Sequence, residues 1–118
     1  MAAVLFLLVR SGAIAAPSSS HDVQAGKLLF ERQCASCHGA GGRGDGPSAA
    51  GLATKPADLA DGRLMNPLPD TFLVTVIRHG GPAQGLAPTM PPFEKFLSDA
   101  QTAQVVAYES TRLNSSHT

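Results

Sequence analysis

The two cysteines of this chain stand in one short motif, Cys34-Ala35-Ser36-Cys37-His38. Two residues separate the cysteines, and a histidine follows the second one at once. The chain has 118 residues and only 5% aromatic residues, with no tryptophan. A domain of this size buries a modest fraction of its surface, and small domains often depend on a covalent staple or a cofactor. The motif is therefore the first place to look for what holds the fold together.

Four kinds of site compete for this motif. A disulfide between cysteines this close closes a tiny loop and stabilises little. A redox-active dithiol of the thioredoxin kind needs a βαβ context, which the sequence does not indicate. A zinc site needs four ligands, and the other histidines lie at unsuited spacings. Covalent attachment of haem uses every residue: Cys34 and Cys37 form thioethers with the vinyl groups, and His38 coordinates the iron. We predict this fourth site, with one covalently bound haem c.

The second axial ligand of the iron has three candidates. Met90 lies in the segment LAPTMPPF, where prolines fix backbone angles and lower the cost of ordering a ligand loop. Met65 is better explained by packing in the core or at the haem edge. His79 stands at the end of a predicted helix, where the helix dipole favours such a residue. We predict that Met90 is the ligand. A thioether opposite His38 raises the reduction potential relative to a second imidazole.

The pattern of apolar residues predicts helices near both ends of the chain and one between them. The first begins near Asp22, as its cap, and runs to the motif; the second covers the segment from Asp70, again a candidate cap, to the glycine pair at 80–81. The last begins at a capping box, with Ser98 at the cap and Gln101 at the third position. Residues 39–63 have loop and turn composition almost throughout. The sequence therefore predicts an all-α fold of three to five helices with long loops.

The ends of the chain have their own composition. Residues 1–15 combine a short apolar run with the small residues Ala13-Ile14-Ala15, a pattern typical of a secretory signal peptide. No lysine or arginine precedes the run, so an uncleaved anchor is the alternative. We expect a flexible lead-in over 16–22, one domain over 23–113 and a flexible tail over 114–118. Haem attachment occurs outside the bacterial cytoplasm, so we expect a periplasmic protein.

The segment from Val23 to Leu113 resembles the class I cytochromes c, the small soluble proteins with a single haem. The resemblance rests on CASCHG, on PTMPPF, and on LSDAQTAQVVAYESTRL near the end. It implies that the first and last helices cross closely, with Gly26 and Phe30 meeting Val105 and Tyr108. In that family close contact between the backbones at the crossing requires a small residue, which accounts for a glycine inside a predicted helix.

The resemblance also implies a residue behind the axial histidine. In the family, the carbonyl group of a proline accepts a hydrogen bond from the free nitrogen of that histidine, and Pro47 occupies the matching place. One position departs from the family pattern, because Glu109 stands where an aliphatic residue usually faces the interior. A buried carboxylate is costly unless it is paired or protonated. We expect a rotated last turn, a solvent-exposed Glu109 or a charged partner.

These features together predict an electron carrier and not an enzyme. Two strong axial ligands leave no open site for a small-molecule substrate at the iron. Nine basic and nine acidic residues cancel, so no strong field indicates nucleic acid as a partner. The expected partners are redox proteins, membrane-bound or periplasmic, that dock at the exposed haem edge. The alternative is a haem subunit of a periplasmic dehydrogenase or sulfur-oxidising complex.

Overall fold

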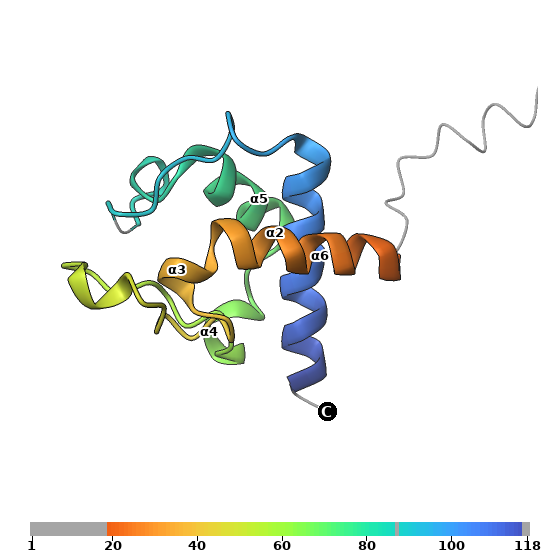
Figure 1. Cartoon of the computed structure of the whole chain (residues 1–118), viewed down its shortest axis with the longest axis horizontal. Coiled ribbons are helices and arrows are strands. Elements are labelled where there is room, and N and C mark those ends of the chain that lie inside the picture. Colours follow the sequence, from red (N-terminus) through yellow and green to blue (C-terminus); the bar gives the residue numbers. More distant parts are fainter. Residues whose placement is uncertain (1–18, 87, 117–118) are drawn as a thin grey trace, which may run out of the picture.

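The computed structural model describes residues 19–86 and 88–116, and the predicted signal peptide over 1–15 lies outside these ranges. The described residues form α-helices and short 3-10 helices without any strand (Figure 1). The prediction of an all-α fold with long loops is therefore confirmed. In chain order the elements are α2 (Ser20–Gln33), α3 (Ala35–His38), η1 (Ala49–Gly51), α4 (Gly62–Met65), α5 (Asp70–His79), η2 (Pro82–Gln84) and α6 (Asp99–Ser116).

Helix α2 begins earlier than predicted. The cap is Ser19, whose hydroxyl oxygen accepts a hydrogen bond of 3.0 Å from the backbone N–H of Asp22. Serine and aspartate are both good caps, and the start at Ser20 leaves Asp22 in the first turn, where the helix dipole favours its charge. Residues 20–22 of the predicted flexible lead-in are therefore helical. Likewise α6 continues to Ser116, into the tail predicted to be flexible.

Helices α2 and α6 cross closely, as Figure 1 shows. At the crossing, a Cβ atom added to Gly26 would lie 1.9 Å from the carbonyl oxygen of Gln104, so only glycine fits. One helical turn further along α2, Phe30 packs against Tyr108 with ring centroids 5.7 Å apart. Val105 and Phe30 are almost fully buried, with 2% and 1% of their surface exposed. The close crossing implied by the family resemblance is confirmed.

The capping box at the start of α6 is present as predicted. The side chain of Gln101 accepts a hydrogen bond from the backbone N–H of Ser98, and the Ser98 hydroxyl accepts one from the N–H of Gln101. Helix α5 packs beside α6 and ends at Gly80, whose φ of 84° favours glycine. At its start, Pro69 is the capping position and Asp70 the first helical residue, so the helix begins one residue earlier than predicted. None of the described helices is long and apolar enough to span a membrane.

The segment predicted as loop contains two short helical pieces. The 3-10 helix η1 follows the motif region, and α4 is capped by Asp61, whose carboxylate accepts a hydrogen bond of 3.0 Å from Arg63 N–H. Each is a single turn, shorter than the periodic patterns on which helix prediction depends. Elsewhere the segment consists of turns, in agreement with its glycine-rich composition.

Candidate cofactor site

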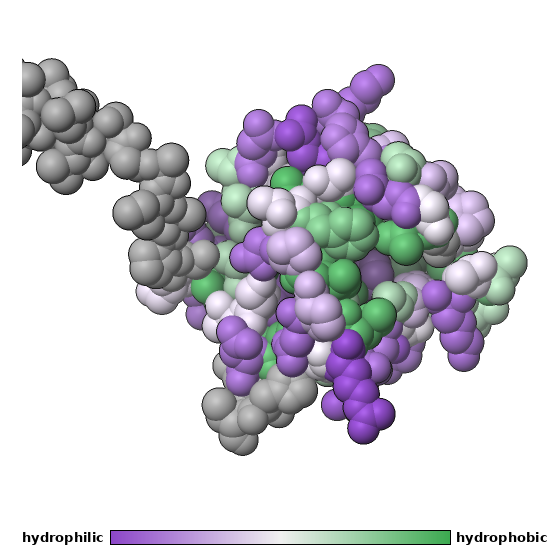
Figure 2. All heavy atoms as spheres, turned by 180° about the vertical axis from the view of Figure 1, so that it is seen from behind, coloured by the Kyte–Doolittle hydropathy of each residue, from purple (hydrophilic) through white to green (hydrophobic). Residues whose placement is uncertain are grey.

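An apolar cavity of about 450 Å³ lies between α2, α3, α5, α6 and the loops that join them. It brings together Cys34, Cys37, His38 and Met90, which the sequence separates by half the length of the chain. The volume falls within the range of about 300–1,000 Å³ that is usual for ligand and cofactor pockets. Apolar residues supply most of the remaining wall: Phe30, Leu52, Leu59, Leu64, Met65, Leu68, Phe72, Leu73, Val76, Ile77, Leu86, Phe93, Val105 and Val106. On the face turned away in Figure 1, apolar side chains gather at the centre with hydrophilic ones around them (Figure 2).

Both cysteines are free thiols and do not form a disulfide. Cys34 ends α2, and its backbone N–H donates to the carbonyl of Phe30, while Cys37 lies one turn later on α3. The chain is thus helical on both sides of Cys34, and both thiols face one cavity. Burial, and then the negative charge of Glu109, raise the pKa of Cys34 to about 12. Cys34 therefore remains a protonated thiol at neutral pH.

His38, the last residue of α3, also lines the cavity. Burial lowers its pKa, the backbone of Ala57 opposes this, and the charge of Arg112 adds to the lowering. The Nδ1 atom is buried, and no partner among the described residues meets hydrogen-bond geometry with it, so Ala57 acts on the ring without a full bond. Pro47, the predicted partner, is exposed. Because Nδ1 of His38 has no partner among the described residues, the predicted hydrogen bond to Pro47 is not formed in this structure.

Met90 is held against the end of α5 by backbone hydrogen bonds. Its carbonyl accepts from the N–H of Gly81 at 3.0 Å, and Phe93 N–H donates to the carbonyl of Ile77 at 2.9 Å. The chain around Met90 therefore runs beside the last turn of α5, and Met90 lines the cavity there. The Met90 side chain is half-buried and forms part of the cavity wall.

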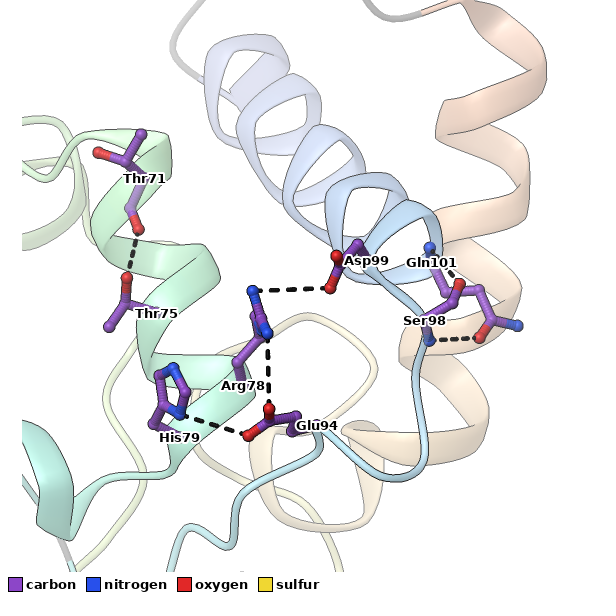
Figure 3. Close-up of polar contacts among 8 residues, drawn as sticks. All are labelled: Thr71, Thr75, Arg78, His79, Glu94, Ser98, Asp99 and Gln101. Carbon is purple, nitrogen blue, oxygen red and sulfur yellow. Dashed lines mark hydrogen bonds and ion pairs between the residues drawn. The ribbon is translucent and has the colours of Figure 1, made fainter.

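A group of ion pairs anchors the chain just beyond Met90 (Figure 3). Glu94 lies 3.5 Å from Arg78 and 3.5 Å from His79, both in the last turn of α5, and its backbone N–H donates to the carbonyl of Arg78 at 3.2 Å. Arg78 also approaches Asp99 at the start of α6, at 3.6 Å. We call these four residues the Glu94 bracket. It connects α5, α6 and the Met90 segment.

The two alternative ligands lie in different places. Met65 is buried, with 7% of its surface exposed, and lines the same cavity as Met90. His79 is exposed, pairs with Glu94 and is not part of the cavity wall. Sequence reasoning placed Met65 in core packing and His79 at a helix end, and both positions agree with the structure.

Glu109 is buried and has a charged partner, which is one of the three outcomes expected from the sequence. Its carboxylate oxygens accept hydrogen bonds of 2.5 and 2.6 Å from one nitrogen of Arg112, a turn further along α6. Burial raises the pKa of Glu109, and the Arg112 charge and hydrogen bonds oppose the rise. Sequence reasoning missed Arg112 as part of the site. The spacing of three residues on a predicted helix could have indicated the pair.

Two free thiols, an imidazole kept neutral by burial and a thioether thus surround one apolar space. These are the donors that a covalently attached haem requires. The residues present therefore fit the cofactor.

Residues 21–108 match the family model described as cytochrome c oxidase, cbb3-type, subunit III. The chain belongs to this family of cytochromes c. The resemblance to class I cytochromes c is confirmed, and the cofactor of this cytochrome is haem c with its iron. Membership of this family and the likeness to a redox-complex chain support haem-based electron transfer.

Among solved structures, the cytochrome is similar to a chain of the reducing HAO-like protein complex of Kuenenia stuttgartiensis, with a TM-score of 0.70 and 30% sequence identity. The match covers 86% of this cytochrome and 48% of that chain, so the cytochrome spans about half the length of its neighbour. No curated protein sequence matches it.

Proposed function

We propose that this cytochrome holds a single haem, attached through Cys34 and Cys37 and coordinated by His38 and Met90. It transfers electrons between redox proteins and is not itself an enzyme. The observation that carries this proposal is the cavity, because four predicted cofactor residues from distant parts of the chain line one apolar space of suitable size. A chance motif would not bring a methionine from a proline-rich loop to the same space.

The roles of the residues follow from their chemistry. Haem c supplies an iron that gains and loses one electron between its ferric and ferrous states. Cys34 and Cys37 would hold the haem through thioethers, and His38 and Met90 would coordinate its iron, which would leave no place there for a substrate. The apolar wall excludes water and favours the less charged, reduced state. Backbone hydrogen bonds hold the Met90 segment against α5, so little ordering of this loop is needed for Met90 to act as a ligand.

The partners we propose are redox proteins in the bacterial periplasm, which dock where the haem edge reaches the surface. Basic and acidic residues are equal in number, so electrostatic steering is weak and contact is largely apolar. The apolar side chains at the centre of the face in Figure 2 agree with such contact.

A second candidate function is that of a haem subunit in a larger redox enzyme. It is favoured by the structural neighbour, which belongs to an HAO-like protein complex and is about twice as long as this chain. A free carrier elutes as a monomer from a periplasmic extract. A subunit co-purifies with a catalytic chain at constant ratio.

Optical spectra of the oxidised and reduced holoprotein test the proposal. Methionine sulfur on ferric haem iron gives a weak absorption band in the red, and we expect this band in the wild type. Met90→Ala should abolish it and allow carbon monoxide to bind the reduced protein, while Met65→Leu, a matched change in the same cavity, should keep it. A band that survives Met90→Ala would refute Met90 as the ligand.

A further inference from the structure

The ion pair between Glu109 and Arg112 stands apart from the other charged groups of the described chain because it is buried. Only 9% of the Glu109 side chain and 19% of the Arg112 side chain are exposed. In the Glu94 bracket, by contrast, the exposed fractions range from 34% to 85%. An exposed pair contributes little and is screened by salt, whereas buried charges act over longer distances in a medium of low dielectric constant.

Glu109 belongs to the wall of the cofactor cavity. It lines the same space as Cys34, and its negative charge is one cause of the raised pKa of that thiol. It also lines a smaller neighbouring pocket of about 280 Å³ that contains Asp70 and Ser110. Glu109 therefore lies between the cofactor cavity and a second, more polar pocket.

Arg112 extends the pair towards the loop that follows His38. Its guanidinium carbon lies 4.9 Å from the ring centre of Phe30 and 5.1 Å from that of Tyr108, and its Nη1 donates to the carbonyl of Ala40 at 3.1 Å. A Cβ atom at Gly42 would collide with the guanidinium, so the loop fits closely around it. The positive charge thus lies next to Phe30, which lines the cavity.

We propose that Glu109 and Arg112 set the reduction potential of this cytochrome with opposite signs, the carboxylate lowering it and the guanidinium raising it. The ferric iron carries one more positive charge than the ferrous iron, so a buried negative charge stabilises the oxidised state and a buried positive charge stabilises the reduced state. Neither residue contacts the iron; both act through the electric field inside the cavity wall. The inference rests on the proposed function, since it requires haem in this cavity.

Lys55 is the other charged group in the cavity wall, and it is exposed. Solvent screens the Lys55 charge, and a change at Lys55 would leave the pair intact. Of the two charged residues that line the cavity, Glu109 is therefore the one whose charge can be altered with the larger effect on the potential.

The test is a spectroelectrochemical titration of holoprotein variants. Glu109→Gln keeps the shape of the side chain and removes the negative charge, while Arg112 stays protonated, so we expect a higher potential than in the wild type. The double variant Glu109→Gln, Arg112→Gln has no charge at either position, and we expect a potential close to that of the wild type. The matched controls Glu31→Gln and Arg32→Gln change exposed residues of α2, and we expect no shift.

A merely structural role gives a different pattern. Loosened packing lets water reach the haem and lowers the potential, and the double variant would then shift at least as far as the single one. The proposal is overturned if Glu109→Gln lowers the potential or leaves it unchanged, or if the double variant keeps the whole shift. Should Glu109→Gln fail to fold, Arg112→Gln at mildly alkaline pH takes its place. A potential below those of both the wild type and the double variant then supports the proposal, and any other order overturns it.

The optical spectra separate this failure from that of the proposed function. If the red band of the wild type is present and the potentials do not differ, the ion pair has no tuning role and the axial ligands stand. If the band is absent and the potentials differ as expected, the pair acts on the haem and Met90 is not its ligand.

Discussion

A methyl group added at Gly26 would test the helix crossing that positions the cysteine motif. In Gly26→Ala the new Cβ atom would lie 1.9 Å from the carbonyl oxygen of Gln104 and 3.0 Å from the Cβ of Tyr108. The first contact is with backbone, which cannot rotate away, so α2 and α6 must move apart. This opens the contact between Phe30 and Tyr108 and exposes part of the core at Val105.

The magnitude follows from two opposing effects. Alanine favours a helix over glycine by about 1 kcal/mol, and overpacking in a core costs typically about 1–3 kcal/mol, here the upper value because backbone must move. The expected net loss is about 2 kcal/mol in the free energy of unfolding, or roughly 8–16 °C in Tm for a domain of this size. Urea and thermal unfolding of the oxidised holoprotein measure both quantities.

Gly51→Ala is the matched control. Gly51 lies in η1, and nothing lies within 4 Å of an added Cβ atom there, so we expect unchanged or slightly raised stability. If Gly26→Ala is as stable as the wild type while Gly51→Ala behaves as expected, the close crossing does not constrain the fold and the reasoning is wrong.

Three further predictions concern the bracket, the buried carboxylate and the docking surface. Glu94→Gln should change the free energy of unfolding by less than about 1 kcal/mol, because its ion pairs are exposed. The red band of this variant should nevertheless weaken on warming at a lower temperature than that of the wild type. The control Lys95→Gln changes the next residue, which is also exposed, and should behave as the wild type. Burial raises the pKa of Glu109 above its usual value of 4.5, so the folded state binds its proton more tightly and the contribution of this group to stability falls as pH rises through the window between the two values. The free energy of unfolding of Glu109→Gln minus that of the wild type should therefore increase with pH in that window, and a flat difference would contradict the raised pKa. The rate of electron transfer with the physiological partner should depend weakly on ionic strength, and a steep dependence would count against apolar docking.

Local patterns were enough to predict much of this fold. The capping box at Ser98 depends on residues three apart, and the chemistry of the CxxCH motif is complete within itself. Gly26 was informative for the opposite reason, because a glycine inside a helical pattern is unfavourable locally and implies a contact from elsewhere. Met90 was predicted from the rigidity of its proline-rich surroundings, and the structure places it in the cavity.

The sequence could not predict what depends on contacts between distant segments. Ser19 and Asp22 are equally plausible caps, and only the register of α2 against α6 distinguishes them: Gln104 of α6 donates a hydrogen bond of 3.4 Å to the Asp22 carboxylate. The position of Pro47 relative to His38 depends on the path of a glycine-rich loop, which has no periodic pattern. The partner of Glu109 was left open for the same reason, since burial decides whether a carboxylate needs one.

The cavity is built from two parts whose supports are separate. The crossing at Gly26 holds α2, and with it Cys34 at its end, whereas the Glu94 bracket and the backbone hydrogen bonds of Met90 hold the other axial side against α5. The first support is buried and contributes to global stability; the second is exposed and contributes little to it. Damage to the crossing should therefore lower the global stability without first displacing Met90, and damage to the bracket should displace Met90 in a protein that remains folded. If Met90 is the ligand, as we propose, its hold on the iron can change without cost to the fold.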